Sequence, residues 1–327
     1  MHVGRSYRLR DFVFWSRRSI LYMTAVSVLA VVMHLVPMLS AFTVPWSIVL
    51  VIGTTASFVA GFKNSQVLQR SGEALQTFSG IVATSRMLAN ICCDFTQPEV
   101  ARRIVLRHLA WLTALRYFLR KSRPWETMSR PSNREFRRRY QIQEDSGSLP
   151  AELATLMGAE GKAAADASHP ALALLAEQGH EINMLLQRGD IPSQIFGELS
   201  KLYRECQDHQ ARCERIKNSP YPRQYAIVSA MFVVIFVTLL PFGIVQIVSE
   251  LAGSGPLIWL TVPFSVLLGW IYLSLDQVGE NTSNPFEGNA NDVPISQICR
   301  DIEIEMRGKL GDKDLPAPLL PVNGIAM

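Results

Sequence analysis

The sequence predicts an all-α membrane protein with four transmembrane helices and a further helical region outside the bilayer. Charged residues make up 18% of the 327-residue chain, whereas soluble proteins average about 25%. The charge is also unevenly spread, because residues 19–62 contain no Asp, Glu, Lys or Arg and residues 224–275 contain only Glu250. This pattern excludes an ordinary soluble domain, a disordered chain and a secreted disulfide scaffold.

Each apolar block is long enough for two helices, since one crossing takes about 20 apolar residues. Turn signals divide the blocks near Ser40–Pro45 and near Glu250–Pro256. Long continuous apolar runs indicate helices rather than barrel strands. The first block is too long for a signal peptide. We therefore expect spans at about 19–39, 45–64, 224–249 and 256–275.

The distribution of basic residues predicts the orientation of these spans. Residues 1–18 contain five arginines against Asp11 alone, and the hairpin tips 40–44 and 250–255 contain no basic residue. Because Lys and Arg mark the cytoplasmic side, we expect both termini in the cytoplasm. The chain then divides into a basic N-terminus (1–18), two spans (19–64), a cytoplasmic helical region (65–223), two further spans (224–275) and a cytoplasmic tail (276–327).

The cytoplasmic region is predicted to be helical throughout. The second span continues without Pro from Lys63 to about Cys93, which predicts one helix that leaves the membrane and runs on for about 45 Å. Apolar residues at helical spacing, and Pro residues at the breaks, predict further helices at 100–121, 149–165, 170–188, 192–217 and 295–310. Residues 311–327, rich in Pro and Gly, are expected to fray.

Motifs for enzymatic chemistry are absent from the sequence, so we expect no enzyme and no cofactor. Cys206, His209 and Cys213 share one helix face and suit zinc, but a fourth ligand is not evident and packing is the favoured interpretation. His34 inside the first span flags a polar intramembrane position. The arginines of residues 130–139 suit anionic lipid or nucleic acid, or a salt-bridged helix face, which we favour. The net charge of +4 requires no nucleic-acid partner.

The second span carries two parallel stripes of residues at i, i+4 and i+8. Gly53, Ser57 and Gly61 form a small-residue stripe that lets helices approach closely in lipid. One position on lie Thr54, Phe58 and Phe62. These side chains suit either the lining of a narrow pore, where Phe rings form a hydrophobic constriction, or an ordinary lipid-facing or core surface.

Several short motifs, in order around the four spans, resemble the bacterial bestrophin family. They cover nearly the whole chain and are Gly61-Phe62-Lys63-Asn64-Ser65, Pro220-Tyr221-Pro222, Leu239-Leu240-Pro241-Phe242, Leu273-Ser274-Leu275-Asp276, Asn284-Pro285-Phe286 and Ala290-Asn291-Asp292-Val293-Pro294. The resemblance implies a homopentameric ion channel around a central pore, in a bacterial inner membrane.

The family pattern also implies roles for particular residues. Thr54, Phe58 and Phe62 match the hydrophobic neck, with Thr54 in place of the usual aliphatic residue. Gln194, beside Ile195, matches a second, cytoplasmic constriction that is apolar in bacterial members. Calcium-gated animal members carry an acidic run after Asn-Pro-Phe, but this chain offers only Glu287 and Asp292 there, too few carboxylates for calcium.

The leading hypothesis is a channel for small monovalent ions. The family is known mainly for chloride, whereas acidic residues such as Asp94 or Glu99 would favour cations if they face the pore. The alternative from another class is a membrane-anchored signalling or scaffold protein whose cytoplasmic helices bind a partner.

Overall fold

The computed structural model describes residues 1–4, 9–39, 44–252 and 255–327 and is helical. Four helical segments are long and apolar enough to cross a membrane. They are α1 (Leu9–Leu35), α2 (Trp46–Phe95), α9 (Arg223–Ala252), and η1 (Pro256–Leu260) with α10 (Thr261–Thr282). Residues 40–43 and 253–254, which belong to the two predicted turns, lie outside the described residues.

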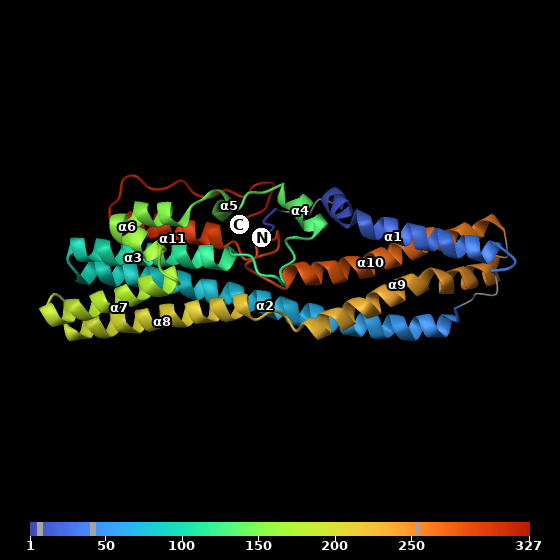
Figure 1. Ribbon diagram of the computed structural model, residues 1–327, viewed down its shortest axis with the longest axis horizontal. Helices are drawn as coiled ribbons and strands as arrows, with labels where there is room; N and C mark the ends of the chain where they lie inside the picture. Colours follow the sequence, from blue (N-terminus) through green and yellow to red (C-terminus); the bar gives the residue numbers. More distant parts are fainter. Residues whose placement is uncertain (5–8, 40–43, 253–254) are drawn as a thin grey trace.

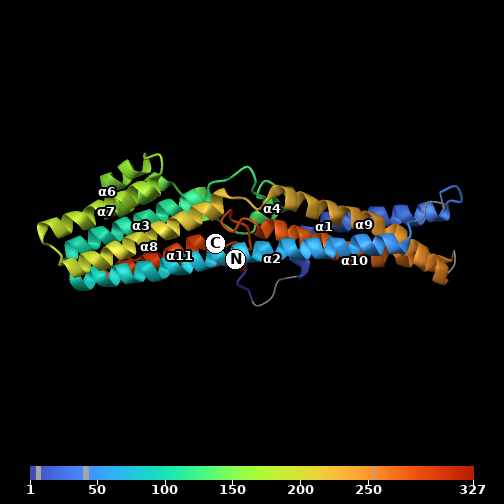
Figure 2. The same cartoon turned by 90° about the horizontal axis from the view of Figure 1, so that it is seen from below.

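The remaining helices form the other end of an elongated molecule (Figures 1 and 2). We call this end the polar half and the end with α1, α9 and α10 the apolar half. The polar half contains α3 (Pro98–Arg120), α4 (Pro131–Arg137), α5 (Gln143–Ser146), α6 (Leu149–Ala165), α7 (Pro170–Arg188), α8 (Ser193–Asn218) and α11 (Ile295–Lys309). Helix α2 runs through both halves, and both termini lie near the junction.

The first helix begins ten residues before the span that the sequence predicts and also ends earlier. Charge marks the edge of the apolar block but does not stop the helix, because long arginine side chains reach polar partners beyond it. Arg17 and Arg18 both contact Glu135, which lies on α4 in the polar half. The basic N-terminal segment is therefore part of α1 from Leu9 onward.

The polar half has a single large apolar core that α2, α3, α7, α8 and α11 build together. Trp111 and Phe78 are among its largest fully buried side chains, and the Trp111 indole donates a 2.7 Å hydrogen bond to Gln210. Helix α6 is kinked at Gly158, whose φ of +60° suits glycine. The predicted helices of this half are confirmed, with ends that differ by a few residues.

The expectation that residues 311–327 fray is wrong. The tail runs back along the polar half to the junction (Figure 1), where Ile325 is paired with His2 in an isolated antiparallel bridge. Ile325 and Met327 are buried against Phe136 and Tyr140. Proline and glycine content predicts the absence of helix, but these buried contacts hold an irregular segment in place.

The apolar half is held by close packing of α2 against α9 and α10. Gly53 is buried on the face of α2 that meets α9, and a Cβ at this position would lie 2.6 Å from Cε2 of Phe236. Phe236 in turn packs on Tyr272 of α10, with ring centroids 4.6 Å apart. Glycine at 53 therefore sets the distance between the two helices.

We expect Gly53→Ala to destabilise the protein by about 1–3 kcal/mol, because the added methyl overpacks this contact. Gly72→Ala is the matched control, since a Cβ at position 72 meets no atom within 4 Å. This substitution also removes the destabilisation of about 0.5–1 kcal/mol that a glycine causes inside a helix. Thermal unfolding of the purified proteins in detergent should show a lower Tm for Gly53→Ala than for wild type, and no decrease for Gly72→Ala. Equal effects would contradict the packing role of Gly53.

Candidate functional site

One face of α2 is left uncovered along its whole length. Within the apolar half this face carries Phe58 and Phe62, which are 78% and 54% exposed, and the neighbouring Thr54. The opposite face is buried against the other helices through Gly53, Ala56 and Ala60 and similar positions. The structure thus brings Thr54, Phe58 and Phe62 onto one exposed stripe, which suits either a pore or a lipid-facing surface.

The same face changes character where α2 enters the polar half. At alternating steps of three and four residues, its exposed positions from 65 to 83 are small or polar and carry no charge, and the same spacing then continues to Met87, Asn90 and Asp94. The uncharged positions are Ser65, Gln69, Gly72, Gln76, Ser79 and Ala83. Lipid-facing helices are apolar at their exposed positions, whereas this stripe can lie along water. The uncovered face therefore passes from an aromatic segment to a wettable one on a single straight element.

The three residues of the small-residue stripe have different surroundings. Gly53 packs on α9, and the Ser57 hydroxyl is 2.6 Å from the hydroxyl of Tyr272 on α10. Gly61 is exposed, and a Cβ there would meet no atom within 4 Å. Two members thus contact helices of the same chain, and the third leaves an open notch.

An ion pair at the junction is a feature that residue patterns alone did not suggest. Lys63 Nζ lies 2.7 Å from Asp276 Oδ1, with the side chains 3% and 14% exposed. Asn64 also donates a 3.4 Å hydrogen bond to the Leu275 carbonyl. A signal for the pair is present in the sequence, because these are the first charged residues after each of the two apolar blocks.

The candidate constriction at Gln194 and Ile195 lies in the first turn of α8, at the end of the polar half farthest from the junction (Figure 1). Gln194 is exposed, whereas Ile195 is half-buried and packs against the large core. Of the two side chains, Gln194 is the one available to a surface or an opening.

The helix face with Cys206, His209 and Cys213 is a packing surface. Both cysteines are buried in the core, and burial raises the pKa of the Cys206 thiol to about 12. A raised thiol pKa opposes formation of the thiolate that binds metal. His209 fills the space beside Gly80, and no group of three potential metal ligands occurs among the residues that the structure describes.

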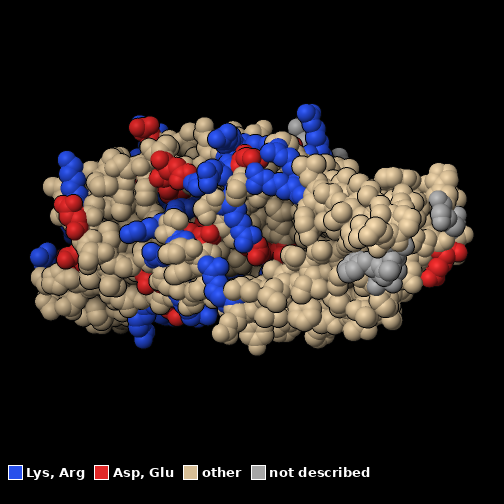
Figure 3. Space-filling model, turned by 45° about the vertical axis from the view of Figure 1, so that its right-hand side comes forward, with Lys and Arg blue, Asp and Glu red and all other residues tan. Residues whose placement is uncertain are grey.

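The arginine segment 130–139 is partly salt-bridged. Arg130 pairs with Glu280, Arg137 with Asp145, and Arg139 with Asp11. Arg134 and Arg138 have no ion-pair partner in the described part of the chain. The segment borders the junction, and Figure 3 shows Lys and Arg gathered there beside a surface almost free of charge.

Glu287 and Asp292 belong to a buried polar network at the junction. Glu287 accepts hydrogen bonds from the Thr127 hydroxyl at 2.6 Å and from its backbone N–H at 2.8 Å. Asp292 accepts from the backbone N–H groups of Gly288 and Asn289. Burial raises the pKa of both carboxyls, with their mutual repulsion adding to that of Glu287. The network joins the loop after α10 to the segment before α4.

A family model described as "Bacterial/Fungal Bestrophin protein" matches residues 16–308, most of the chain. The chain belongs to this bestrophin family. This confirms the family suggested by the motifs, and the family is one of channels rather than enzymes.

Similar proteins support the assignment of this chain to the bestrophin family. The Escherichia coli (strain K12) protein named "Voltage-dependent anion channel-forming protein YneE" is 25% identical over 272 residues, which are 83% of this chain and 79% of the relative. A similarly named protein of Mesorhizobium japonicum is 26% identical over 271 residues, 83% of this chain and 76% of its own. The crystal structure of a bacterial bestrophin homologue from Klebsiella pneumoniae shares the fold. It matches 91% of this chain and 99% of its own, with a TM-score of 0.77 and 22% identity.

We expect Glu287→Gln to become more stable relative to wild type as the pH rises from about 5 to about 8. Burial raises the folded-state pKa above the unfolded value of about 4.3. Wild type is therefore most stable below the unfolded pKa and loses stability as the pH rises through the folded pKa, whereas Gln does not titrate. Thermal unfolding across this pH range tests the sign, with Glu177→Gln on the exposed face of α7 as control.

Proposed function

We propose that this protein is a channel for small monovalent anions, assembled as a homopentamer around a pore lined by the uncovered face of α2. The observation that carries the proposal is the change along this face, from Phe58 and Phe62 to the polar stripe that starts at Ser65. Five copies of such a helix around an axis would combine a narrow apolar segment with a water-filled passage. Neighbouring copies would also meet the open notch at Gly61.

The proposed neck consists of rings of Thr54, Phe58 and Phe62. Hydrophobic constrictions gate by dewetting, and the edges of Phe rings carry partial positive charge that suits anions. The Thr54 hydroxyl donates a 2.9 Å hydrogen bond to the Val51 carbonyl of its own helix. Threonine is smaller and more polar than phenylalanine, so the outermost ring is the most easily wetted. The ring of Gln194 beside Ile195 is the proposed second, polar constriction.

Basic groups accompany the acidic groups near this path, which suits anions. Arg70 lines a pocket of about 520 Å³ together with Phe62 and Glu73. It donates a hydrogen bond to the Ile216 carbonyl, while Glu73 pairs with Arg215. Asp94, whose charge would favour cations, lies 3.7 Å from Lys309. The two relatives named above carry names of anion channel-forming proteins.

The placement proposed for the chain is the bacterial inner membrane, with both termini and residues 65–223 in the cytoplasm. The partners are the lipid bilayer, the permeating ions and four further copies of the chain. The segment divisions at 18, 64, 223 and 275 serve as the boundaries of the membrane-embedded parts. No cofactor is needed for passive conduction.

Reconstitution of the purified protein in planar bilayers under a KCl gradient tests this function. We expect unitary currents whose reversal potential lies toward the chloride equilibrium potential. The mass of the detergent-solubilised assembly should correspond to five chains of 36.6 kDa. A well-folded pentamer that gives no currents would contradict the proposed channel function. A monomeric protein would favour the alternative, a membrane-anchored scaffold. Reversal toward the potassium potential would keep the channel and overturn the selectivity.

The double variant Phe58→Ala, Phe62→Ala should raise open probability or conductance several-fold, because the proposed neck then stays wetted. Phe264→Ala is the matched control, since Phe264 is 53% exposed on the outer surface of α10. Single-channel recording compares the three proteins. If the double variant gives the same currents as wild type, Phe58 and Phe62 do not form the neck.

A further inference from the structure

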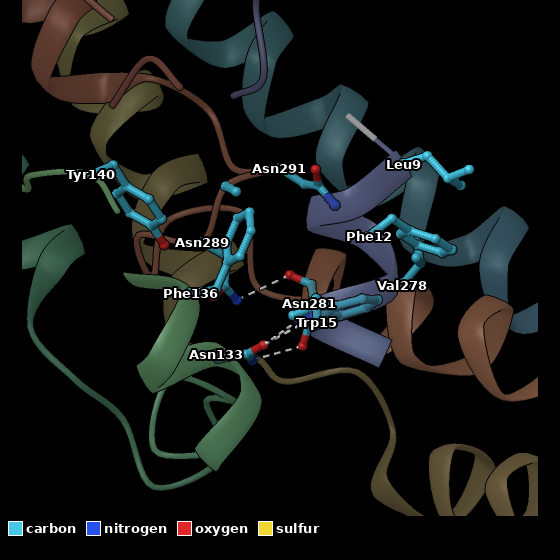
Figure 4. A pocket seen from close by; sticks show the side chains of 11 residues that line it. Leu9, Phe12, Trp15, Asn133, Phe136, Tyr140, Val278, Asn281, Asn289 and Asn291 are labelled. Carbon is cyan, nitrogen blue, oxygen red and sulfur yellow. Dashed lines mark hydrogen bonds between the residues drawn. The ribbon is translucent and has the colours of Figure 1, made fainter. Parts of the chain in front are cut away.

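A pocket of about 450 Å³ lies where α1, α4 and α10 meet the loop after α10 (Figure 4). Its walls are mainly apolar and aromatic and include Leu9, Phe12, Trp15, Phe136, Tyr140 and Val278. Ligand pockets have volumes of about 300–1,000 Å³ and predominantly apolar walls. This pocket has the size and lining of a binding site, and it lies apart from the exposed face of α2.

Four polar side chains of the pocket, those of Asn133, Tyr140, Asn281 and Asn289, are already engaged in hydrogen bonds. Asn133 and Asn281 exchange hydrogen bonds of 2.8 and 3.0 Å, and Asn289 donates to the Asn281 carbonyl at 3.2 Å (Figure 4). The Tyr140 hydroxyl donates to the Gly288 carbonyl at 2.9 Å. These groups hold the walls together and leave the interior to a hydrocarbon body.

The setting of the pocket is the boundary between membrane and cytoplasm, and its surroundings are basic. Trp15 lies four residues before the first apolar block, and tryptophan is enriched at membrane–water interfaces. The wall-forming segments 9–18 and 130–139 contain eight arginines against two acidic residues. Arg10 has no ion-pair partner among described residues, and the Arg139 guanidinium lies 5.5 Å from the centre of the Phe136 ring.

We propose that this pocket binds a long-chain carboxylate, with the hydrocarbon chain among the aromatic walls and the carboxylate at the basic margin where exposed Arg10 follows the lining residue Leu9. Anionic headgroups are attracted to such basic segments. A single-chain ligand fits better than a two-chain phospholipid, because a volume of about 450 Å³ has room for one long acyl chain but not for two chains. To enter the pocket, the acyl chain of the ligand has to leave the bilayer. A phospholipid can place one acyl chain there only by separating it from its other acyl chain.

Photolabelling of the purified full-length protein tests this assignment. Palmitate carrying a diazirine on its chain is added in detergent, and phosphatidylglycerol carrying the same chain is used in nanodiscs. Peptide mapping should place the palmitate label on segments 9–15, 133–140 and 278–291, with loss of label when unmodified palmitate competes. Label confined to the outer faces of α9 and α10 would overturn the proposal, as would pocket labelling by phosphatidylglycerol alone.

Two variants sharpen the result. Ala290→Trp fills the pocket and should abolish its labelling, whereas Ala290→Ser, and Leu267→Trp on the exposed side of α10, should leave it unchanged. Exposed Arg10→Gln leaves the walls intact and should weaken palmitate labelling about five-fold without affecting a diazirine-bearing hexadecanol. Full labelling of a correctly assembled Ala290→Trp protein would contradict binding in this pocket. Palmitate labelling of Arg10→Gln equal to that of wild type would contradict the placement of the carboxylate.

Discussion

The structure depends on the buried ion pair between Lys63 and Asp276 at the junction of its two halves. Both charges lie where an apolar block gives way to a polar segment, so each helix would otherwise carry an unpaired charge at the edge of hydrocarbon. Removing one partner of a buried pair costs about 3–5 kcal/mol because the other charge stays buried. The pair therefore ties α2 to α10 where the apolar half meets the polar half.

The continuity of α2 gives this constraint its functional weight. Because one uninterrupted helix carries the aromatic face and the polar face, the distance between Phe62 and the stripe that begins at Ser65 is set by helix geometry alone. Close packing at Gly53 fixes the same helix against α9 in the apolar half. An opening of the proposed neck thus requires α2 to move as a unit, or its Phe side chains to change rotamer.

Sequence patterns predicted the helices well where the physical cause is local. Charge-free blocks, proline breaks and apolar periodicity located the four long apolar helices and most helices of the polar half. They missed the start of α1, because arginines can extend from a continuing helix to distant acidic partners. They also missed the ordered tail, since the burial of Ile325 against Phe136 depends on segments that are far apart in the chain.

Prediction of the candidate site was similarly divided. The i, i+4, i+8 spacing placed Thr54, Phe58 and Phe62 on one face of a helix, because 3.6-residue periodicity determines that relation. Spacing cannot say whether another element covers that face. The structure leaves Phe58 uncovered and shows Gly53 on the covered side. The pocket at the junction has no local signature at all, since its walls come from three helices and two loop segments.

The junction is the region through which the two halves of the chain act on each other. The hydrogen bonds of Glu287 reach the segment before α4, Asn281 at the end of α10 bonds to Asn133, and the Trp15 indole of α1 donates to Asn133 as well. Buried networks of this kind are either fully satisfied or costly, because an unpaired polar group in a low-dielectric interior is strongly unfavourable. A shift of α1 or α10 therefore alters the same contacts that position α4 and the loop at 287–292. The network thus connects the apolar half to the polar half, although the largest hydrophobic clusters of the two halves are separate.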